Sequence, residues 1–448
     1  MSTPLPPPIA LPADDPRTIM ADNPMRARQM IAVALCFLLN ALDGFDVLAI
    51  TFAAPGIARD WQIDPGAIGF IISIGLAGMV VGSLTLGPLA DRIGRRRQIL
   101  FSLVVMTAGM FASAAAPDML TLSILRAITG LGLGAMLASI NAMAAEFANR
   151  RRRDLSVSIM AAGYPVGGVV GGWVAAQLLR SHGWESVFIF GGIATVVMIP
   201  LILALMPESI GWLAASGRAD ALDRINAILR RIGHPEGRQL APTEVKSASS
   251  TALFGPEFRV TTIALILMYG AHMMTFYYAL GWAPSLVASL GFDQSSASII
   301  SVFMNLGGAT GGFVLGFLAP RIGLKPMLLV GMTGAAIAVT IFGMVPANFL
   351  ALQVAAVALG FLSNGSVVGF YALMARAYPA ALRAGGTGVV IGFGRIGAAF
   401  GPLLAGQLLA WNMGRTATSA ILGLGSLAAA IILATVAMRG VREGESAD

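Results

Sequence analysis

Two aspartates lie three residues apart inside a long apolar stretch near the start of the chain, at Asp43 and Asp46. If this stretch is helical, the spacing places both carboxylates on one side of the helix. Poor solvation and a neighbouring like charge both disfavour an ionised carboxylate, so we expect at least one of the two to bind a proton near physiological pH. The spacing does not say which one. The alternative is that one of them pairs structurally with an arginine or lies at an interface.

Two arginines occur in similarly apolar stretches, at Arg126 and Arg395. A guanidinium can hold a carboxylate through two parallel hydrogen bonds. Arg126 is therefore a candidate for binding an anionic ligand, or for pairing with one of the two aspartates. Arg395 has Gly394 and Gly397 beside it, which leave room for a ligand. A structural ion pair is the competing interpretation for both arginines.

Uncharged polar side chains form a second group of candidates. His272 is the only histidine within an apolar stretch. It suits a hydrogen-bonded structural residue as well as a proton- or substrate-binding one, because histidine titrates readily. Trp282 is better explained by an aromatic belt at a membrane interface than by a ligand site. The other candidates for polar lining, which could instead bond helix to helix, are Tyr164, Tyr277, Asn305, Asn364 and Tyr371.

The composition explains why charge inside these stretches is informative. The 448 residues are 56% hydrophobic and only 11% charged, with a mean hydropathy of +0.79, whereas soluble domains are about 25% charged. Crossing a bilayer takes about 20 apolar residues. We predict twelve spans, at 29–53, 66–89, 97–116, 120–147, 155–179, 186–206, 260–288, 295–319, 326–345, 349–374, 384–410 and 416–438.

The distribution of positive charge predicts the topology. The 29 Lys and Arg residues concentrate in the two tails and in the loops that follow even-numbered spans. Cytoplasmic loops carry the positive excess, so both termini are expected in the cytoplasm, and the chain is expected to be a multi-pass protein of a bacterial inner membrane. Residues 1–28 lack the apolar core of a signal peptide and are expected to be a disordered cytoplasmic tail. Residues 207–258 are expected to be a cytoplasmic linker with short surface helices, and residues 439–448 a second tail.

An internal repeat divides the chain into two halves. Residues 87–97 read GPLADRIGRRR and residues 316–326 read GFLAPRIGLKP, which align at an offset of 229. Glycines of the fifth and eleventh spans align at the nearly equal offset of 230. Two parallel six-helix halves with a midplane site between them are a transporter architecture. We therefore predict an all-α membrane protein with two pseudo-symmetric six-helix bundles, at 29–206 and 259–438.

These motifs carry a resemblance to a known family. The loop at 87–97 resembles the signature loop between spans 2 and 3 of the major facilitator superfamily. More narrowly, the DGFD motif at 43–46 and the glycine-rich stretches beside Arg126 and Arg395 resemble the aromatic acid:proton symporter family. The resemblance implies the twelve-helix facilitator fold and proton symport of benzoate-like and hydroxybenzoate-like anions. It also implies a functional role for both arginines.

The resemblance further implies a gate at the cytoplasmic end of the first half. In the superfamily, a charge network around this loop latches the inner gate in the outward-open state. The corresponding positions here are Gly87, Asp91, Arg92, Arg95 and Glu146. Pro320 takes the place of Asp91 in the second copy of the loop, so a latch there is expected to be weaker. The alternative is that these arginines only follow the positive-inside rule and are neutralised by nearby acids.

Signals of other functional classes are absent from the sequence. It has no Walker-type phosphate loop, no HExxH zinc motif and no Cys/His cluster. The single cysteine, Cys36, is expected to be a small buried hydrophobe. The net charge of +7 does not indicate nucleic-acid binding, because the basic residues fall in short loops. We expect no metal, no cofactor and no enzymatic activity.

The leading hypothesis is import of a small aromatic carboxylate with protons, through alternating access of two halves in a lipid bilayer. Arg395 or Arg126 would bind the carboxylate, while Asp43 or Asp46 takes the proton. Proton-coupled uptake of a non-aromatic organic anion stays an alternative, and so does proton-antiport efflux of aromatic or drug-like compounds. A transport-derived sensor is disfavoured by the short tails and linker. A monomer is expected, as is common in the superfamily.

Overall fold

The computed structural model describes residues 12–241 and 250–436, and within these ranges it contains helices and no strand. Twelve of the described helices are long and apolar enough to cross a membrane. They are α2 (Ala27–Trp61), α3 (Pro65–Thr85), α5 (Arg95–Ala114), α6 (Met119–Glu146), α7 (Arg153–Leu178), α8 (Glu185–Leu205), α11 (Arg259–Ala288), α12 (Gln294–Ile322), α13 (Leu324–Met344), α14 (Phe349–Ala377), α15 (Ala380–Ala410) and α16 (Gly414–Thr435). Each predicted span coincides with one of these helices. The first span is longer than predicted, because α2 continues to Trp61.

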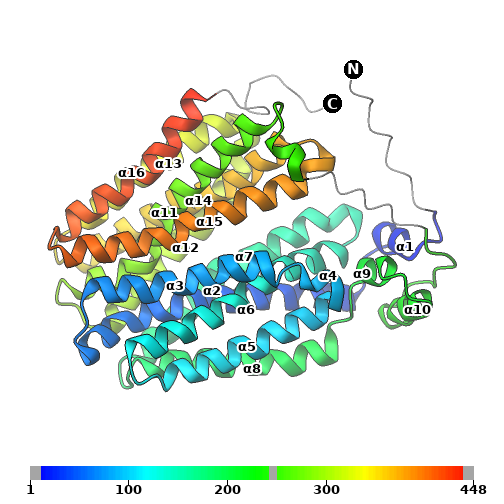
Figure 1. The fold of residues 1–448 in the computed structure, drawn as a ribbon, viewed down its shortest axis with the longest axis horizontal. Coiled ribbons are helices and arrows are strands. Elements are labelled where there is room, and N and C mark those ends of the chain that lie inside the picture. Colours follow the sequence, from blue (N-terminus) through cyan, green and yellow to red (C-terminus); the bar gives the residue numbers. More distant parts are fainter. Residues whose placement is uncertain (1–11, 242–249, 437–448) are drawn as a thin grey trace.

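The long helices form two groups, one from each half of the chain (Figure 1), and the two groups pack in the same way. In the first half α3 packs against α6 and α5 against α8, while in the second half α12 packs against α14 and α13 against α16. Equivalent glycines of the repeat, Gly94 and Gly323, have φ angles of 102° and 96° and begin α5 and α13. Glycine adopts this conformation readily and other residues do not. The predicted all-α fold with two similar bundles is confirmed.

Polar side chains cap four of the long helices at the end of the bundle that we call the far end. The capping residues of α3, α6, α12 and α14 each accept a hydrogen bond from the main-chain N–H three residues on, at 2.7 to 3.0 Å. Such caps satisfy N–H groups that the first turn of a helix leaves free. They are Asp64, Asp118, Asp293 and Asn348.

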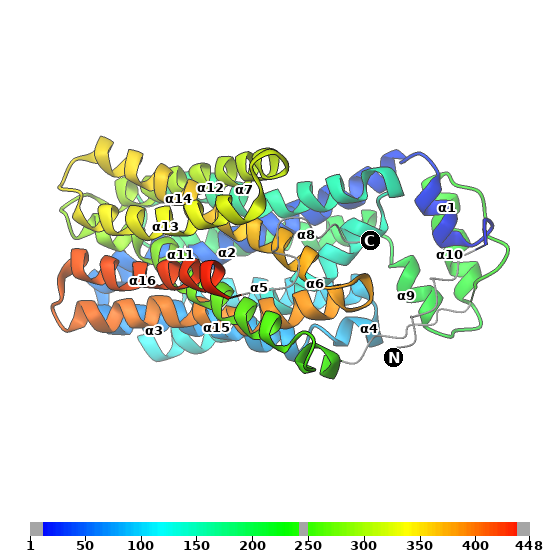
Figure 2. The same cartoon turned by 90° about the horizontal axis from the view of Figure 1, so that it is seen from above.

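The opposite end, which we call the linker end, carries the short helices of the chain. α4 (Leu89–Ile93) follows α3, and α9 (Ile210–Ala215) and α10 (Ala221–Ile232) lie in the linker. Together with α1 (Pro16–Asp22), the two linker helices project beyond the first half (Figure 2). Residues 242–249 of the linker and the predicted tail at 439–448 lie outside the described residues.

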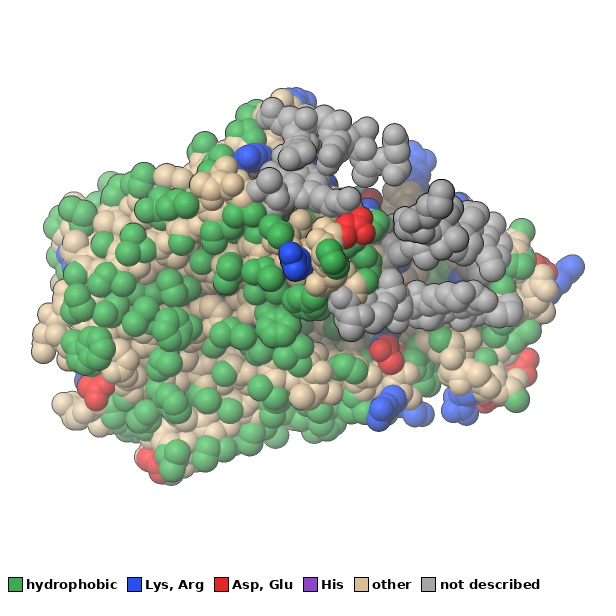
Figure 3. Space-filling view, turned by 45° about the horizontal axis from the view of Figure 1, so that its top comes forward, with side chains coloured by type: hydrophobic (Ala, Val, Ile, Leu, Met, Phe, Trp, Pro, Cys, Tyr) green, Lys and Arg blue, Asp and Glu red, His purple; other side chains and the backbone are tan. Residues whose placement is uncertain are grey.

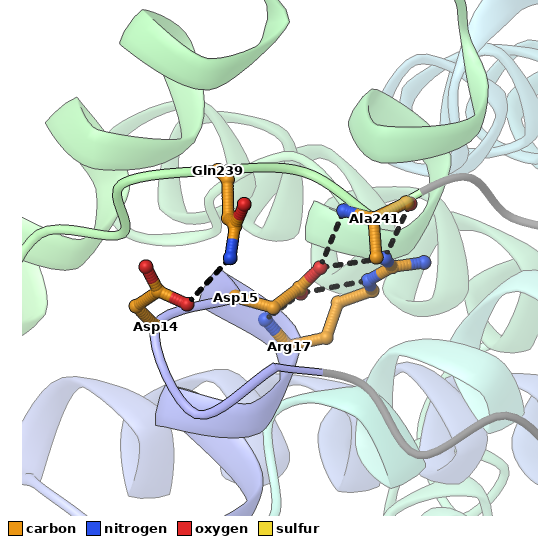
Figure 4. A network of polar contacts seen from close by, with 5 residues as sticks. All are labelled: Asp14, Asp15, Arg17, Gln239 and Ala241. Atoms are coloured by element: carbon orange, nitrogen blue, oxygen red, sulfur yellow. Dashed lines mark hydrogen bonds and ion pairs between the residues drawn. The ribbon is translucent and has the colours of Figure 1, made fainter.

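The N-terminal tail differs from its prediction, because its described part forms α1 instead of being disordered. Asp15 caps this helix by accepting a hydrogen bond from the main chain of Arg17 at 2.9 Å, and it pairs with the Arg17 side chain at 2.7 Å. The same carboxylate accepts from the Ala241 main-chain N–H at 3.0 Å, and Gln239 Nε2 donates to Asp14 at 2.9 Å (Figure 4). These contacts join the tail to the linker, about 225 residues away in the chain, and could not be predicted from the composition of the tail.

Burial and hydrogen bonding act in opposite directions on the Asp15 carboxyl. Burial by itself would raise its pKa, but the hydrogen bonds from Arg17 and from the Ala241 main chain outweigh burial and hold the pKa below its ordinary value. The carboxylate is therefore ionised wherever α1 is docked on the linker at neutral pH.

The halves touch at the far end and part toward the linker end. Two hydrogen bonds of the described chain join the halves at the far end. One runs from Gln294 Nε2 to the Phe52 carbonyl at 3.1 Å, and the other from Arg180 Nε to Ser295 Oγ at 3.3 Å. α3 and α15 also approach closely there, since a Cβ built on Gly69 would lie 2.7 Å from the Pro402 carbonyl oxygen of α15. Figure 1 shows the two sets of ribbons diverging toward the end that carries α4, α9 and α10.

The outer surface of the bundle suits a hydrocarbon environment. Figure 3 shows hydrophobic side chains spread over the bundle, with most charged side chains toward its ends. Large apolar side chains such as Val104, Val170 and Val330 are 54%, 55% and 69% exposed. Water would penalise exposing so much apolar surface, and lipid does not.

Candidate functional site

Asp46 on α2 and Arg126 on α6 form a buried ion pair. Arg126 donates from Nη1 to Asp46 Oδ1 and from Nη2 to the Asp46 main-chain carbonyl, both at 2.9 Å. The two side chains are 2% and 3% exposed, and the guanidinium also lies 5.8 Å from the ring centre of Phe188. From its sequence, Arg126 could either bind an anion or pair with Asp43 or Asp46, and in the structure it pairs with Asp46. Its guanidinium is turned into the first half, so in this conformation a substrate would have to displace Asp46 to reach it.

Asp43, one turn before Asp46 on α2, has a different environment. Its side chain is 2% exposed, and Oδ1 is buried without a hydrogen-bond partner in the described chain. Asn40, one turn earlier on α2, does not hydrogen-bond to it. Asn40 Nδ2 instead donates to the carbonyls of Met160 and Ala161 on α7, at 2.9 and 3.2 Å. The structure therefore separates two aspartates that the sequence left equivalent: one is paired and one is free.

Arg395 lies at the middle of α15 and faces the first half across the central space. It interacts electrostatically with Tyr277, Tyr269 and Tyr371 of its own half and with Asp43 of the other. Within the described chain its guanidinium makes no hydrogen bond and no ion pair within 4.0 Å. A cation inside the membrane costs free energy unless it is paired, and such groups mark substrate or ion pathways. Arg395 is thus available to an anion.

Close contact between α11 and α15 brings the tyrosines to Arg395. A Cβ on Gly394 would collide with the ring of Tyr269, and one on Gly397 would collide with the Gly270 carbonyl. The Tyr269 ring packs edge-on against Phe370, with ring centres 5.5 Å apart, and lies 6.5 Å from that of Tyr371. Gly394 thus makes room for the ring of Tyr269, so the space beside Arg395 is partly filled by the protein itself.

Tyr371 and Tyr164 extend this cluster in two directions. Tyr371 on α14 is 45% exposed although it lies well inside its helix. Tyr164 on α7 interacts electrostatically with Asp43, and its buried hydroxyl lies close to that of Tyr277 on the other half. Tyr164, Asn305 and Asn364 share a small hollow between α7, α12 and α14. Asn364 Nδ2 donates to the Gly308 carbonyl at 2.8 Å and Asn305 Nδ2 to the Ser301 carbonyl at 2.9 Å, so both amides are partly committed to helix contacts.

His272 lies apart from this cluster, fully buried within the second half. Its Nε2 is 2.9 Å from the Ser363 carbonyl and its Nδ1 is 2.9 Å from Ser426 Oγ. Because a carbonyl only accepts, Nε2 carries the hydrogen, and Nδ1 then accepts from the serine hydroxyl. Both ring nitrogens of a neutral imidazole are thereby satisfied. This arrangement matches the structural alternative for His272 and leaves no free nitrogen for a substrate.

Trp282 also differs from its expectation. It is 3% exposed, and its Nε1 donates to the Pro402 carbonyl at 3.1 Å. The interpretation as part of an aromatic belt is wrong, because the ring is packed between α11 and α15 and does not face the membrane interface.

Among the described residues, the hydrogen bonds of Glu146, Asp91 and Gly87 reach the first half and the linker. Glu146 accepts hydrogen bonds from Ser209 Oγ and the Gly211 main chain, both at 2.6 Å, and so holds the start of α9. Asp91 accepts from Trp212 Nε1 at 2.8 Å through its main-chain carbonyl. No ion pair within 4.0 Å involves Asp91, Arg92, Arg95 or Glu146 among the described residues, although Arg95 lies close enough to Glu146 to interact electrostatically. The expected charge network is not assembled in this conformation.

Gly87 lies in the turn between α3 and α4, where its main-chain N–H donates to the Gly82 carbonyl at 3.0 Å. Glu208 was not predicted, yet its Oε1 accepts from the Arg96 and Ser209 main-chain N–H groups, both at 2.9 Å. It thereby joins the start of α5 to that of α9. Tyr269 was also not among the predicted site residues. Its spacing of eight residues from Tyr277 places the two on nearly the same helix face, a signal that the sequence offered.

No group of three or more His, Cys, Asp or Glu side chains that could hold a metal ion occurs in the described part of the chain. The candidate site therefore consists of a free guanidinium, a free carboxyl group and several phenol rings between the two helical bundles. A guanidinium can bind an anion, and a carboxyl group can bind a proton.

Twelve membrane-crossing helices in two similar halves, with charged groups held between them, define a membrane transporter and not an enzyme. The family model described as "Major Facilitator Superfamily" matches residues 36–286 and 265–447, and the chain belongs to this superfamily. It is therefore a multi-pass protein of the bacterial inner membrane.

Relatives with named substrates match along nearly the whole chain. The gallate transporter of Pseudomonas putida is 32% identical over 437 residues, covering 96% of each chain. The 3-(3-hydroxy-phenyl)propionate transporter of Escherichia coli is 31% identical, with 94% of this chain and 97% of the relative covered. The 4-hydroxybenzoate transporter PcaK of Acinetobacter baylyi is 29% identical, with 94% and 93% covered.

A solved structure shares the fold. The inward-open conformation of the xylose transporter XylE from E. coli superposes with a TM-score of 0.72, covering 93% of this chain and 98% of the other. At 19% identity this likeness concerns the fold alone. The resemblance to the major facilitator superfamily predicted from the motifs is confirmed.

Proposed function

We propose that this protein imports a small aromatic carboxylate together with protons. The observation that carries the proposal is the free guanidinium of Arg395, which lies among three tyrosines and across from the free carboxyl group of Asp43. The substrates of the relatives support the substrate class, since gallate, 4-hydroxybenzoate and 3-(3-hydroxyphenyl)propionate all combine a phenol ring with a carboxylate.

Binding would use the two ends of such a substrate separately. The carboxylate accepts two parallel hydrogen bonds from Arg395, whose planar fork matches it. The ring lies against Tyr269, Tyr277 and Tyr371, where offset or edge-on contacts between aromatic rings contribute about 0.5–1.5 kcal/mol each. Ring hydroxyl groups can pair with the neighbouring hydroxyl groups of Tyr164 and Tyr277.

Asp43 supplies the coupling in this mechanism. With the site empty, its carboxylate and the Arg395 guanidinium face each other across the two halves. When a substrate anion binds Arg395, Asp43 is left buried without a counter-charge. Protonation of Asp43 removes that unfavourable charge, because an isolated carboxylate is strongly disfavoured out of water. Substrate and proton therefore stabilise each other in the site, which is the requirement for symport.

Alternating access would carry the loaded site from one side to the other. If the positively charged linker end is cytoplasmic, the closed far end makes this conformation inward-facing. The charge network around the loop at 87–97 would then form only in the outward-open state. This would explain why it is absent from the present conformation. Movement of one net positive charge inward gains about 2.3 kcal/mol per 100 mV. Co-transport of one proton with a monovalent anion moves no net charge and relies on the pH gradient.

The experiment is uptake into liposomes containing the purified protein, with labelled 4-hydroxybenzoate outside and an inwardly directed proton gradient. We expect accumulation above equilibrium that a protonophore abolishes. Competition by unlabelled acids defines the substrate: dicarboxylates or sugar acids that outcompete benzoate-type acids would replace the aromatic class with an aliphatic one. Proton-driven extrusion of the labelled acid from preloaded vesicles, without uptake, would instead establish efflux.

A further inference from the structure

A second hollow, far from the central site, lies where the linker helices meet the first half. It has a volume of about 440 Å³ and is bounded by the start of α5, the end of α8, the linker and one side of α10. None of the proposed substrate- or proton-binding residues lines it. It is at the linker end of the bundle, where the lipid-facing helix surface ends and the arginine-rich loops begin.

The lining of this hollow is strongly basic. One carboxylate, Glu208, lines it, and its Oε1 accepts hydrogen bonds from main-chain N–H groups of Arg96 and Ser209. Against it stand six arginines: Arg28, Arg96, Arg97, Arg218, Arg224 and Arg231.

Three of these guanidinium groups form no ion pair. Arg28, Arg97 and Arg231 have no carboxylate within 4.0 Å among the described residues. Arg96 donates from Nη2 to the Leu203 main-chain carbonyl, and its Nε is buried without a hydrogen-bond partner. Arg218 and Arg224 share a single carboxylate, Asp220, at 2.9 and 2.6 Å. The hollow therefore holds a clear excess of positive charge that the protein itself does not neutralise.

The rest of the lining is apolar and continues onto the membrane-facing surface. Leu203 and Leu205 at the end of α8 line the hollow and are 52% and 47% exposed. Leu100 on α5 and Ile228 on α10 line it as well. A long hydrocarbon chain could thus leave the hollow along α8 without crossing a polar surface.

One side of α10 combines the two characters. Its lining residues are spaced at positions i, i+3, i+4 and i+7, which places them on one helix face. Two arginines bracket two small or apolar side chains on this face, namely Arg224, Ala227, Ile228 and Arg231. Ile225 and Leu229, on the neighbouring face, are fully buried in the protein core. The helix therefore has one face packed by protein and another, basic and apolar, turned into the hollow.

We propose that this hollow is a binding site for an anionic phospholipid of the inner membrane leaflet. The phosphate would lie among Arg28, Arg97 and Arg231, and an acyl chain would follow Leu203 and Leu205 along α8. Basic pockets at the cytoplasmic ends of membrane helices bind acidic head groups, and each arginine near the surface contributes about 1 kcal/mol to such binding. A soluble anion would use the same guanidinium groups but would leave the apolar wall uncovered.

The test is native mass spectrometry of the full-length protein in detergent, titrated with dioleoyl phosphatidylglycerol or with dioleoyl phosphatidylcholine. Because three charges are involved, the wild type should retain phosphatidylglycerol at least about tenfold more tightly than phosphatidylcholine. The triple variant Arg28→Gln/Arg97→Gln/Arg231→Gln should lose most of this preference. A matched control, Arg151→Gln/Arg152→Gln/Arg153→Gln, removes the same charge from exposed positions outside the hollow and should keep it.

A steric variant distinguishes binding in the hollow from general attraction to positive charge. Ala227→Trp fills the hollow while keeping all six arginines, and it should weaken phosphatidylglycerol binding as the triple variant does. Thermal unfolding of each variant verifies that it is folded. Equal retention of the two lipids, equal losses in the control triple variant, or displacement of the lipid by millimolar glycerol phosphate would each overturn the proposal. The last of these would identify a site for a soluble anion.

Discussion

Arg126 donates to both the side chain and the main chain of Asp46, at 2.9 Å each, in a region where the two side chains are nearly inaccessible. The double contact fixes the rotation of α6 against α2. It also answers a question about the second aspartate of the first span: Asp46 has a counter-charge built into its own half, and Asp43 does not. The two carboxylates can therefore serve different purposes although they are three residues apart.

The Asp46–Arg126 pair is expected to be structural. Asp46→Asn or Arg126→Gln leaves one buried charge without its partner, and each should lower the free energy of unfolding by about 3–5 kcal/mol. The double variant should lose less than the sum of the two, because it leaves no unpaired charge. Unfolding in detergent, followed for the parent and all three variants, measures this cycle. Additive losses, or an Asp46→Asn variant as stable as the parent, would show that the pair is not coupled.

Asp43 is expected to carry the transported proton. Asp43→Asn should abolish accumulation driven by a pH gradient while exchange of labelled for unlabelled substrate across the membrane continues, because exchange needs no net proton movement. Its stability should be equal to or above that of the parent, since a buried, unpartnered carboxylate is removed. Uptake and exchange assays in the same liposomes make the comparison.

His272→Gln serves as the control for Asp43→Asn. Both imidazole nitrogens are satisfied inside the second half, so this variant should lose about 1–3 kcal/mol of stability and keep its proton coupling. Should the histidine variant lose coupling while Asp43→Asn retains it, His272 would be the proton carrier and Asp43 would not.

Arg395 is expected to bind the substrate carboxylate. Losing two charge-assisted hydrogen bonds costs about 3 kcal/mol or more, so Arg395→Gln should raise the substrate Kd by about 100-fold. Arg395→Lys keeps the positive charge but loses the planar, two-pronged geometry, so its substrate Kd should lie between those of the parent and of Arg395→Gln. Tryptophan fluorescence or calorimetry on purified protein measures Kd without requiring transport. Arg376→Gln, at an exposed arginine near the end of α14, is the matched control, and an equal loss of affinity there would contradict the assignment.

The docking of the linker on the first half is expected to depend on pH through His234. Burial and the nearby charge of Arg26 lower the pKa of this histidine below its ordinary 6.5, and its Nε2 lies 2.9 Å from Gln29 Oε1 on α2. A group whose folded-state pKa is depressed contributes stability above its unfolded pKa and loses it as the pH falls. Docking should therefore be complete above about pH 6.5 and weaken progressively below it.

Hydrogen exchange of residues 221–241, measured between about pH 7.5 and 5.5 and corrected for the intrinsic rate, follows this docking. We expect protection to fall at the acid end in the parent protein. His234→Gln should remove most of the dependence, whereas His182→Gln, at an exposed position of the far end, should preserve it. Protection that is constant over this range in the parent would rule out the effect. The Asp15 carboxyl, whose pKa is also depressed, is ionised throughout this range and does not contribute to the change.

The relation between sequence and site differs from residue to residue. Arg395 and Asp43 were recognisable because charge inside an apolar run is costly wherever it lies, and this cost needs no coordinates to state. His272 and Trp282 were not resolved in the same way, because each is explained by partners on other helices: Ser426 on α16 and the Pro402 carbonyl on α15. A sequence shows that a polar group must be satisfied but does not identify what satisfies it.

The twelve spans, their division into two halves and the family could be predicted from sequence alone, because these depend on local quantities. Apolar run length sets a membrane span, and the repeated loop requires glycine at positions 94 and 323, where φ is positive. The folded structure was needed to show which aspartate is paired, that α1 docks on the linker, and that Asp91, Arg92, Arg95 and Glu146 form no ion pair among the described residues. These depend on contacts between segments far apart in the chain, whose distances are set by how whole helices pack and by which of its conformations the carrier occupies.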